Sequence, residues 1–425
     1  MQSLRLRLAA ILISTILVET TAAAPVGEPR AETWVDGPLG MRVGGGPQTP
    51  DATADHRGRQ IYVWDDSPTD QGTGIDVFLR IFDAAGTSLV GPVQVNTLEA
   101  DNQRYARVAV SADGSFLVIW ESFEPVGGGV YYPRIRSQKF DSDGAPVGDE
   151  QLLSTVSTDI QVEALANVGA LTGGGYVAVW RSYNSTTFSY EIQGRRVGAN
   201  GVPVGDQFQV NARTDGIYEQ WASVAGLADG GFLAVWAAPQ IQARRFAADG
   251  TPLTGDFQVN TFEPLTTRDQ TDVAVHEDGR VMVVWRAAEP PNQEEIRGRM
   301  YDSALTALGP DFRINTYITG AQSEPQVAGY GAAGFFVVWE SLGSSGPDVV
   351  PDSIEGRVVT GPDAFAGPQF LVNQFTDNSQ ENPGIGGRGG TVAVVWMGRE
   401  NEEVLGQVIM GQFWNICGIF CDGFE

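Results

Sequence analysis

Apolar residues in this chain gather in short unbroken runs, and seven of these runs end on a tryptophan. In Gly230–Trp236, five apolar residues follow two glycines without a polar interruption. A strand with one face in water alternates apolar and polar residues, so an unbroken run predicts a strand buried on both faces. The seven tryptophans stand 49 to 60 residues apart: Trp64, Trp120, Trp180, Trp236, Trp285, Trp339 and Trp396.

Three other short segments recur between the tryptophans. They have the types "RVAV" (107–110), "QARRFAADG" (242–250) and "GDFQVN" (255–260), with Asp-Gly and Gly-Gly pairs as turn signals. Four strands in a unit of about 50 residues are typical of a propeller blade. Immunoglobulin-like sandwiches need about 100 residues each, and an open solenoid needs capping repeats. The sequence therefore predicts an all-β fold, a seven-bladed β-propeller with four-stranded blades.

Closure of the ring is also predicted from the repeat. The last unit ends near Val404–Met410 with no copy of the "VN" strand after it, whereas Pro38–Gly44 resembles a copy without a unit of its own. We therefore expect Met41–Val43 to be the outermost strand of the last blade, which would close the ring and cover a sheet edge. The predicted propeller spans residues 38–410, between a linker at 24–37 and a tail at 411–425.

The N-terminus has the features of a secretory signal peptide over residues 1–23. Arg5 and Arg7 precede an apolar stretch, Leu8–Val18, and small residues follow. The stretch is shorter than the roughly 20 residues that span a bilayer. We expect an exported protein, secreted or extracytoplasmic (periplasm, cell surface or medium), without a membrane span. In such a compartment Cys417 and Cys421, the only cysteines, are candidates for a disulfide within the tail.

The charge balance narrows the set of partners. The chain has 52 acidic and 27 basic residues, a formal net charge of −25. Nucleic-acid phosphates and anionic membrane surfaces would repel such a chain. The favoured interpretation is an acidic surface that keeps the protein soluble and monomeric.

The two faces of the predicted propeller differ in their loops. Turns such as "SADGS" and "LADGG" are short and share one face, whereas long irregular loops follow Trp120, Trp180 and Trp339 on the other. Long loops on a rigid scaffold are where binding groups are usually found. Six aromatic residues on this long-loop face are candidate binding residues for a carbohydrate or a protein partner, although covering the blade edges is an alternative role: Tyr131, Tyr132, Tyr183, Tyr190, Tyr218 and Trp221.

Catalytic motifs are sparse. The two histidines, His56 and His276, fall in equivalent short turns, which favours a structural role. No cofactor is expected; Asp-Gly turns such as "DSDG" (141–144) superficially resemble calcium loops, but they are also the usual hairpin signal. Glu121 and Glu340 follow their tryptophans at matching positions and are candidate binding residues. They would serve as carboxylates for glycoside hydrolysis only if both reach into the central channel, because their blades are three apart in the ring.

A long planar donor recurs two residues before the end of the third strand of each unit. Buried side chains of this type are expected to bond backbone carbonyls and to stack on the tryptophans, a structural role. They are Arg80, Gln138, Arg195, Arg244, Arg299, Arg357 and Gln407.

The repeat pattern "VN…Q…VA…DGGF.VVW.S…I.GRRFDADG…G..F.VN" resembles that of uncharacterised secreted bacterial β-propeller proteins. The resemblance covers roughly residues 38–410 and implies the fold and an extracytoplasmic location, with no defined activity. From the residues we expect a non-catalytic propeller that recognises a carbohydrate or a protein on its long-loop face. The alternative is a glycoside hydrolase or lyase with carboxylates at the mouth of the central channel.

Overall fold

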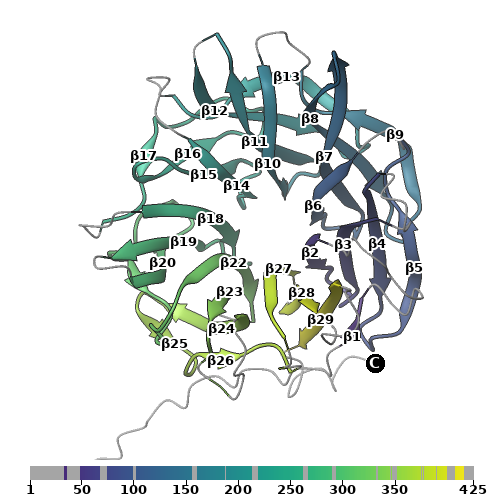
Figure 1. Ribbon diagram of the computed structural model, residues 1–425. Helices are drawn as coiled ribbons and strands as arrows, with labels where there is room; N and C mark the ends of the chain where they lie inside the picture. Colours follow the sequence, from purple (N-terminus) through teal and green to yellow (C-terminus); the bar gives the residue numbers. More distant parts are fainter. Residues whose placement is uncertain are drawn as a thin grey trace, which may run out of the picture.

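The computed structural model contains seven antiparallel sheets arranged in a ring around an open centre (Figure 1). The structure describes residues 33–35, 48–67, 74–98, 102–155, 160–186, 188–212, 219–261, 267–289, 293–331, 334–344, 346, 352–374, 376, 378–388, 390–399 and 407–415. The innermost strands of neighbouring blades touch all round the ring, including the last blade with the first. The chain is a seven-bladed β-propeller, as the repeat predicts.

Each blade is a meander whose strands follow one another from the axis outward. Blades 1 to 3 consist of β2 (Gln48–Ala54), β3 (Gln60–Asp66), β4 (Asp76–Phe82), β5 (Ser88–Gln94); β6 (Gln103–Val110), β7 (Phe116–Gly127), β8 (Val130–Phe140), β9 (Pro146–Leu152); and β10 (Ile160–Ala170), β11 (Tyr176–Asn184), β12 (Ser189–Val197), β13 (Pro203–Gln209). Blades 4 and 5 consist of β14 (Gln220–Gly226), β15 (Phe232–Ala237), β16 (Ile241–Phe246), β17 (Phe257–Gln258); and β18 (Thr267–Val275), β19 (Val281–Glu289), β20 (Gln293–Tyr301), β21 (Phe312–Arg313).

Blades 6 and 7 complete the ring. Blade 6 contains β22 (Gln322–Tyr330), β23 (Gly334–Leu342) and β24 (Asp352–Gly361), with two short outer strands, β25 (Ala364–Phe365) and β26 (Phe370–Leu371). Blade 7 contains β27 (Gln380–Arg388), β28 (Thr391–Arg399) and β29 (Gln407–Asn415), and its outermost strand is β1 (Thr33–Trp34) from the N-terminal part of the chain. Figure 1 shows β1 beside β29, the yellow strand near the other end of the chain.

An N-terminal strand therefore closes the ring as expected, but the segment differs from the predicted one. Thr33 and Trp34 pair with Gly411 and Met410, and the amide of Val35 donates to the carbonyl of Ile409 (2.8 Å). The outermost position is thus filled by Thr33–Val35, upstream of the predicted segment. Met41–Val43 lies outside the described residues. Val35 occupies the position of the valine in "FQVN" of the other blades. Because the matching segment has only three residues, the sequence pattern does not reveal it.

The core lies between the blades and explains the unbroken apolar runs. All seven repeat tryptophans are fully buried. Trp285 of blade 5, for example, packs in one cluster with Leu233 and Val235 of blade 4. The second strand of each blade is covered on both sides by its neighbours, so neither of its faces needs polar residues.

The recurrent planar donors bind blades together. The guanidinium groups of Arg195, Arg244, Arg299 and Arg357 donate to carbonyls of the preceding blade at Leu153, Val210, Val259 and Ile314, over 2.7 to 3.0 Å. Several of them also cover the ring of a Phe or Tyr: Arg80 over Phe82, Arg244 over Phe246 and Arg299 over Tyr301. The expected carbonyl bonds are confirmed for these arginines, whereas Gln138 bonds carbonyls of its own blade and Gln407, the first residue of β29, does not share their position. The stacking partners are rings of the third strands and not the tryptophans.

Candidate functional site

Every innermost strand carries a register shift at an equivalent point near its start, on the long-loop face, and β10 has a second shift before it. Seven register shifts occur at this point, one per blade. At each shift one residue other than glycine takes a left-handed backbone conformation, with φ between 39° and 58°. These seven residues are Thr49, Tyr105, Leu165, Trp221, Gln270, Glu324 and Asn382. A bulge of this kind redirects a side chain, and non-glycine residues in this conformation are strained.

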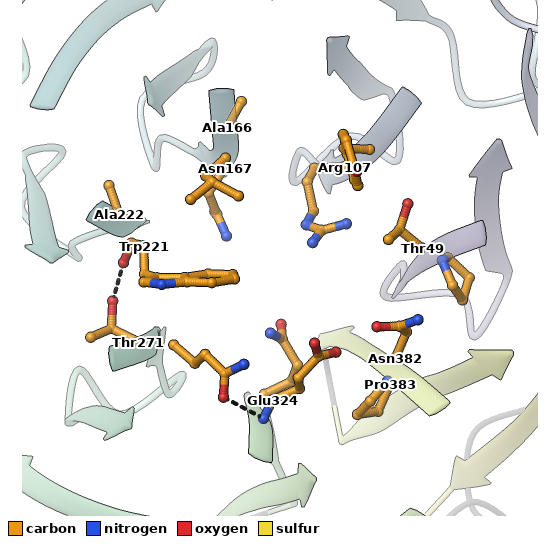
Figure 2. Close-up of a pocket in the computed structure, with 15 residues that line it drawn as sticks. Thr49, Arg107, Ala166, Asn167, Trp221, Ala222, Thr271, Glu324, Asn382 and Pro383 are labelled. Atoms are coloured by element: carbon orange, nitrogen blue, oxygen red, sulfur yellow. Dashed lines mark hydrogen bonds between the residues drawn. The ribbon is translucent and has the colours of Figure 1, made fainter. Parts of the chain in front are cut away.

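The seven redirected residues surround one cavity at the mouth of the central channel. This mouth pocket has a volume of about 250 Å³, and its lining includes all seven together with Arg107, Asn167 and Gln326. Figure 2 shows the indole of Trp221, the guanidinium of Arg107 and the carboxylate of Glu324 reaching into the opening from different blades. The pocket thus combines an aromatic face, one cation, one carboxylate and several amides.

Local hydrogen bonds hold the rim of the mouth pocket in place. The hydroxyl of Thr271 donates to the carbonyl of Trp221, and the amide of Glu324 donates to Oε1 of Gln270 (2.9 Å; Figure 2). These bonds link blade 4 to blade 5 and blade 5 to blade 6. The strained bulge residues are therefore fixed by their neighbours, which is a condition for a preorganised binding site.

Buried carboxylates lie one step further along the innermost strands. Asp51 accepts from the amide of Val108 (2.9 Å), and Asp272 accepts from the amide of Val327 (2.9 Å) and the hydroxyl of Ser223 (2.7 Å). Burial raises the pKa of each aspartate to about 6, although Arg107 and the amide bonds act in the opposite direction. Two carboxyls that titrate close to neutrality therefore lie next to the mouth pocket.

The glutamates predicted as catalytic candidates support the rim instead of lining the mouth pocket. Glu121 accepts from the amide of Leu165 (2.6 Å), and Glu340 accepts from the amide of Asn382 (3.1 Å). Burial raises the pKa of Glu121 to about 7. Burial, and next the charge of Glu324, raise the pKa of Glu340 to about 8. Each carboxyl group fixes a bulge residue of the following blade.

The predicted aromatic candidates divide among several places. Trp221 lines the mouth pocket. Tyr183 and Tyr190 pack on each other across the β11–β12 hairpin (ring centroids 4.9 Å apart), and Arg181 covers Tyr190 at 4.8 Å. The β7–β8 hairpin carries Tyr131, which is exposed, and Tyr132, which lies against Arg134 (5.8 Å). Tyr218, Cys417 and Cys421 lie outside the described residues.

On the other face, His276 and the acidic "DSDG" turn have structural contacts. His276 bonds the carbonyl of Gly331 in the next blade through Nε2 (2.8 Å). In the "DSDG" turn, Oδ1 of Asp141 accepts from the amides of Asp143 and Ala145, so the carboxylate closes a hairpin turn. Among the described residues, no group of three or more His, Cys, Asp or Glu side chains has the arrangement of a metal site.

Sequence reasoning missed most of the mouth pocket, including Arg107 and Glu324. In the segments that contain the bulges, such as "QRYARVAV" and "QSEPQVAG", the two-residue alternation of side chains that a regular strand shows is interrupted just before the apolar residues. That break is the one signal in the sequence. Because the redirected residues differ in chemistry from blade to blade, no repeated motif marks them.

Comparison with known proteins supports the fold. No protein-family model matches the sequence, and no curated protein matches it. A solved protein of unknown function from Dyadobacter fermentans is similar in structure, with a TM-score of 0.55 and 11% identity over 92% of this chain and 99% of that one. The polysaccharide lyase Uly1 is similar with a TM-score of 0.51 and 10% identity, over 86% and 90% of the two chains. In the described residues no helix is long and apolar enough to cross a membrane.

Proposed function

We propose that this protein is an exported propeller that binds a saccharide in the mouth pocket without altering it chemically. The observation that carries the proposal is that Trp221 and Glu324, two of the seven bulge residues, line one opening together with Arg107. An indole offers a flat apolar surface to the C–H face of a sugar ring. Arginine, carboxylate and amide groups offer the donors and acceptors that hydroxyl groups need.

The size of the mouth pocket supports a small ligand group. Its volume of about 250 Å³ is below the roughly 300–1,000 Å³ of pockets that enclose drug-sized ligands. We infer that one terminal sugar unit enters the mouth pocket while the rest of the ligand remains on the long-loop face. Similarity to a polysaccharide lyase is compatible with this class of ligand.

The proposal is tested by calorimetry with the purified protein and a panel of neutral and acidic oligosaccharides. Replacement of Trp221 by alanine removes the stacking surface and is expected to weaken binding about 30-fold, equivalent to about 2 kcal/mol. Leu253→Ala, at an exposed position in the β16–β17 turn on the other face, is the control and should bind normally. Glu324→Gln, which keeps the size of the side chain, is a second pocket variant if Trp221→Ala melts early. A panel without any ligand, or equal losses in Trp221→Ala and Leu253→Ala, would contradict the proposal.

Hydrolysis or elimination at the same place is the second candidate, and Glu324 favours it. Burial raises the pKa of this glutamate, whereas Arg107 and Arg286 lower it. A carboxyl that keeps its proton closer to neutral pH suits a general acid. The same incubations are therefore assayed for new reducing ends and for unsaturated products. Their formation at enzyme-like rates would assign an enzyme and reject the non-catalytic proposal.

A further inference from the structure

The guanidinium group of Arg107 projects into the mouth pocket with little to bind in the protein itself. Its one hydrogen bond to another described residue goes from Nη1 to the carbonyl of Ala106 (3.0 Å). A guanidinium has five N–H donors in a planar fork. Arg107 is the single cationic side chain among the residues that line the mouth pocket, and Figure 2 shows it pointing toward the middle of the opening. Most of its donors thus face the space where a ligand would lie.

Carboxylates surround this cation without pairing with it directly. Five of them interact with Arg107 through their charge: Asp51, Asp65, Glu121, Asp272 and Glu324. They come from β2, β3, β7, β18 and β22. Three further arginines interact by charge with members of this group: Arg104 with Asp65, Arg181 with Glu121 and Arg286 with Glu324. These carboxylates balance the positive charge of Arg107 without forming hydrogen bonds to it in the described part of the chain. The N–H donors of its guanidinium group therefore remain available to a ligand.

We propose that the mouth pocket selects a saccharide that bears a carboxylate, a uronic acid unit, through a two-pronged contact with Arg107, and that acidification strengthens this binding. This inference rests on the saccharide site proposed above. A guanidinium matches a carboxylate with two parallel N–H···O bonds, a contact that a neutral hydroxymethyl group does not reproduce. Trp221 and the amides around the opening would then hold the ring and its hydroxyl groups.

The dependence on pH follows from the carboxyls next to Arg107. A uronate carboxylate is ionised throughout the range in which Asp51 and Asp272 titrate, because their pKa is raised to about 6 by burial. At pH 5.5 these two aspartates are mostly neutral, and so are Asp65 and Glu121, whose pKa burial raises to about 7. The charge of Arg107 is then free to act on the ligand. At pH 7.5 most of these four carboxyls are ionised and repel the ligand carboxylate. Binding therefore takes up protons, and the dissociation constant rises with pH.

The experiment compares tetrasaccharides that differ only in the group at C6. Glucose, galactose and mannose tetrasaccharides and their uronate counterparts of the same linkage are titrated calorimetrically into the full chain at pH 5.5 and 7.5. At least one uronate should bind tighter than its neutral counterpart at pH 5.5, and its dissociation constant should rise tenfold or more at pH 7.5. Arg107→Gln should abolish the preference for the uronate, and Arg107→Lys should restore only part of it.

A second variant tests the aspartates without relying on Arg107. Asp51→Asn with Asp272→Asn keeps an oxygen for each backbone amide and removes both charges, so uronate binding should weaken less between pH 5.5 and 7.5 than it does in the wild type, with Asp65 and Glu121 accounting for the remaining dependence. Melting curves verify that each variant is folded. Equal or tighter binding of the neutral sugars, or a uronate preference that survives in Arg107→Gln, would overturn this inference and leave the saccharide site standing. No binding by any of the six tetrasaccharides would reject both.

Discussion

At the scale of single residues, the mouth pocket depends on seven side chains held in a backbone conformation that they disfavour. Only Asn382 is of a type that adopts left-handed φ readily; Leu165, Trp221 and Glu324 are not. Each such residue costs on the order of 1–3 kcal/mol. Hydrogen bonds from neighbouring blades fix several of them, including Leu165, Trp221 and Glu324. The strain is repeated at one level of the ring, around the cavity that we propose as the saccharide site.

A different set of residues ties the innermost strand to the tryptophan strand. Gln103, Gln322 and Gln380 accept a hydrogen bond from the buried indole of their own blade, over 2.8 to 2.9 Å. Gln220, the first residue of β14, contacts Arg181, and Gln270, the bulge residue of β18, accepts from the amide of Glu324. Similar sequence positions thus have two structural roles, depending on their distance from the bulge.

Replacement of Gln322 by leucine tests the role of these glutamines. Gln322 is fully buried, its Oε1 accepts from Trp339 and its Nε2 donates to the hydroxyl of Ser341 (both 2.9 Å). The variant leaves an indole N–H and a hydroxyl without their hydrogen-bond partner, and it should lower the free energy of unfolding by about 2–4 kcal/mol. Urea titration measures the loss. Gln94→Leu, at the exposed end of β5, is the control and should change stability by less than about 0.5 kcal/mol; a similar small effect of Gln322→Leu would contradict the argument.

At the scale of elements, closure of the ring joins the two ends of the folded chain. The carbonyl of Val35 accepts from Arg80 of blade 1 (2.9 Å), the same contact that Leu153, Val210, Val259 and Ile314 make with the arginine of the following blade. Val35 is fully buried between the first and last blades. The strand β1 is short, yet it supplies both the last sheet edge and one of the recurrent contacts between blades.

Replacement of Val35 by aspartate should therefore open the ring. An unpaired carboxylate in this position lacks solvation, and we expect a loss of at least about 3 kcal/mol in unfolding free energy. Thermal unfolding measures it, and hydrogen exchange should show faster exchange at Met410 and Gly411, which face β1. Val93→Asp, on the half-exposed outer strand of blade 1, is the matched control. Equal stability of the two variants would show that closure contributes little.

At the scale of the whole molecule, the propeller buries acidic groups in addition to the many on its surface. Burial is the largest cause of a raised pKa in six of them: Asp51 and Asp272 to about 6, Asp65, Glu121 and Glu163 to about 7, and Glu340 to about 8. In the unfolded chain such groups titrate near pH 4. Between pH 4 and 8 the folded protein therefore binds more protons than the unfolded one.

Stability should accordingly decrease as pH rises. The stabilisation is complete below the unfolded values near pH 4, and it is lost as pH passes through the folded values between 6 and 8. We expect the unfolding free energy at pH 5.5 to exceed that at pH 8.0 by at least about 2 kcal/mol, since one pKa unit corresponds to about 1.4 kcal/mol. Denaturant titration in 0.5 M salt, which screens the surface charge, measures the difference. A protein that is more stable at pH 8.0 would contradict this.

The sequence by itself determined the propeller, because a strand that is buried on both faces must be apolar throughout and the four-stranded unit repeats seven times along the chain. It also placed the short turns on one face and the long loops on the other, since that division follows from the meander alone. Only the tertiary structure decided which residues meet at the axis. Seven bulges bring side chains of unrelated types together from segments as far apart as Thr49 and Asn382. A local sequence pattern does not indicate which residues of distant blades will face each other across the ring. The same reason applies to the closing strand: Thr33–Val35 is too short to stand out, and its partner, β29, lies at the other end of the chain.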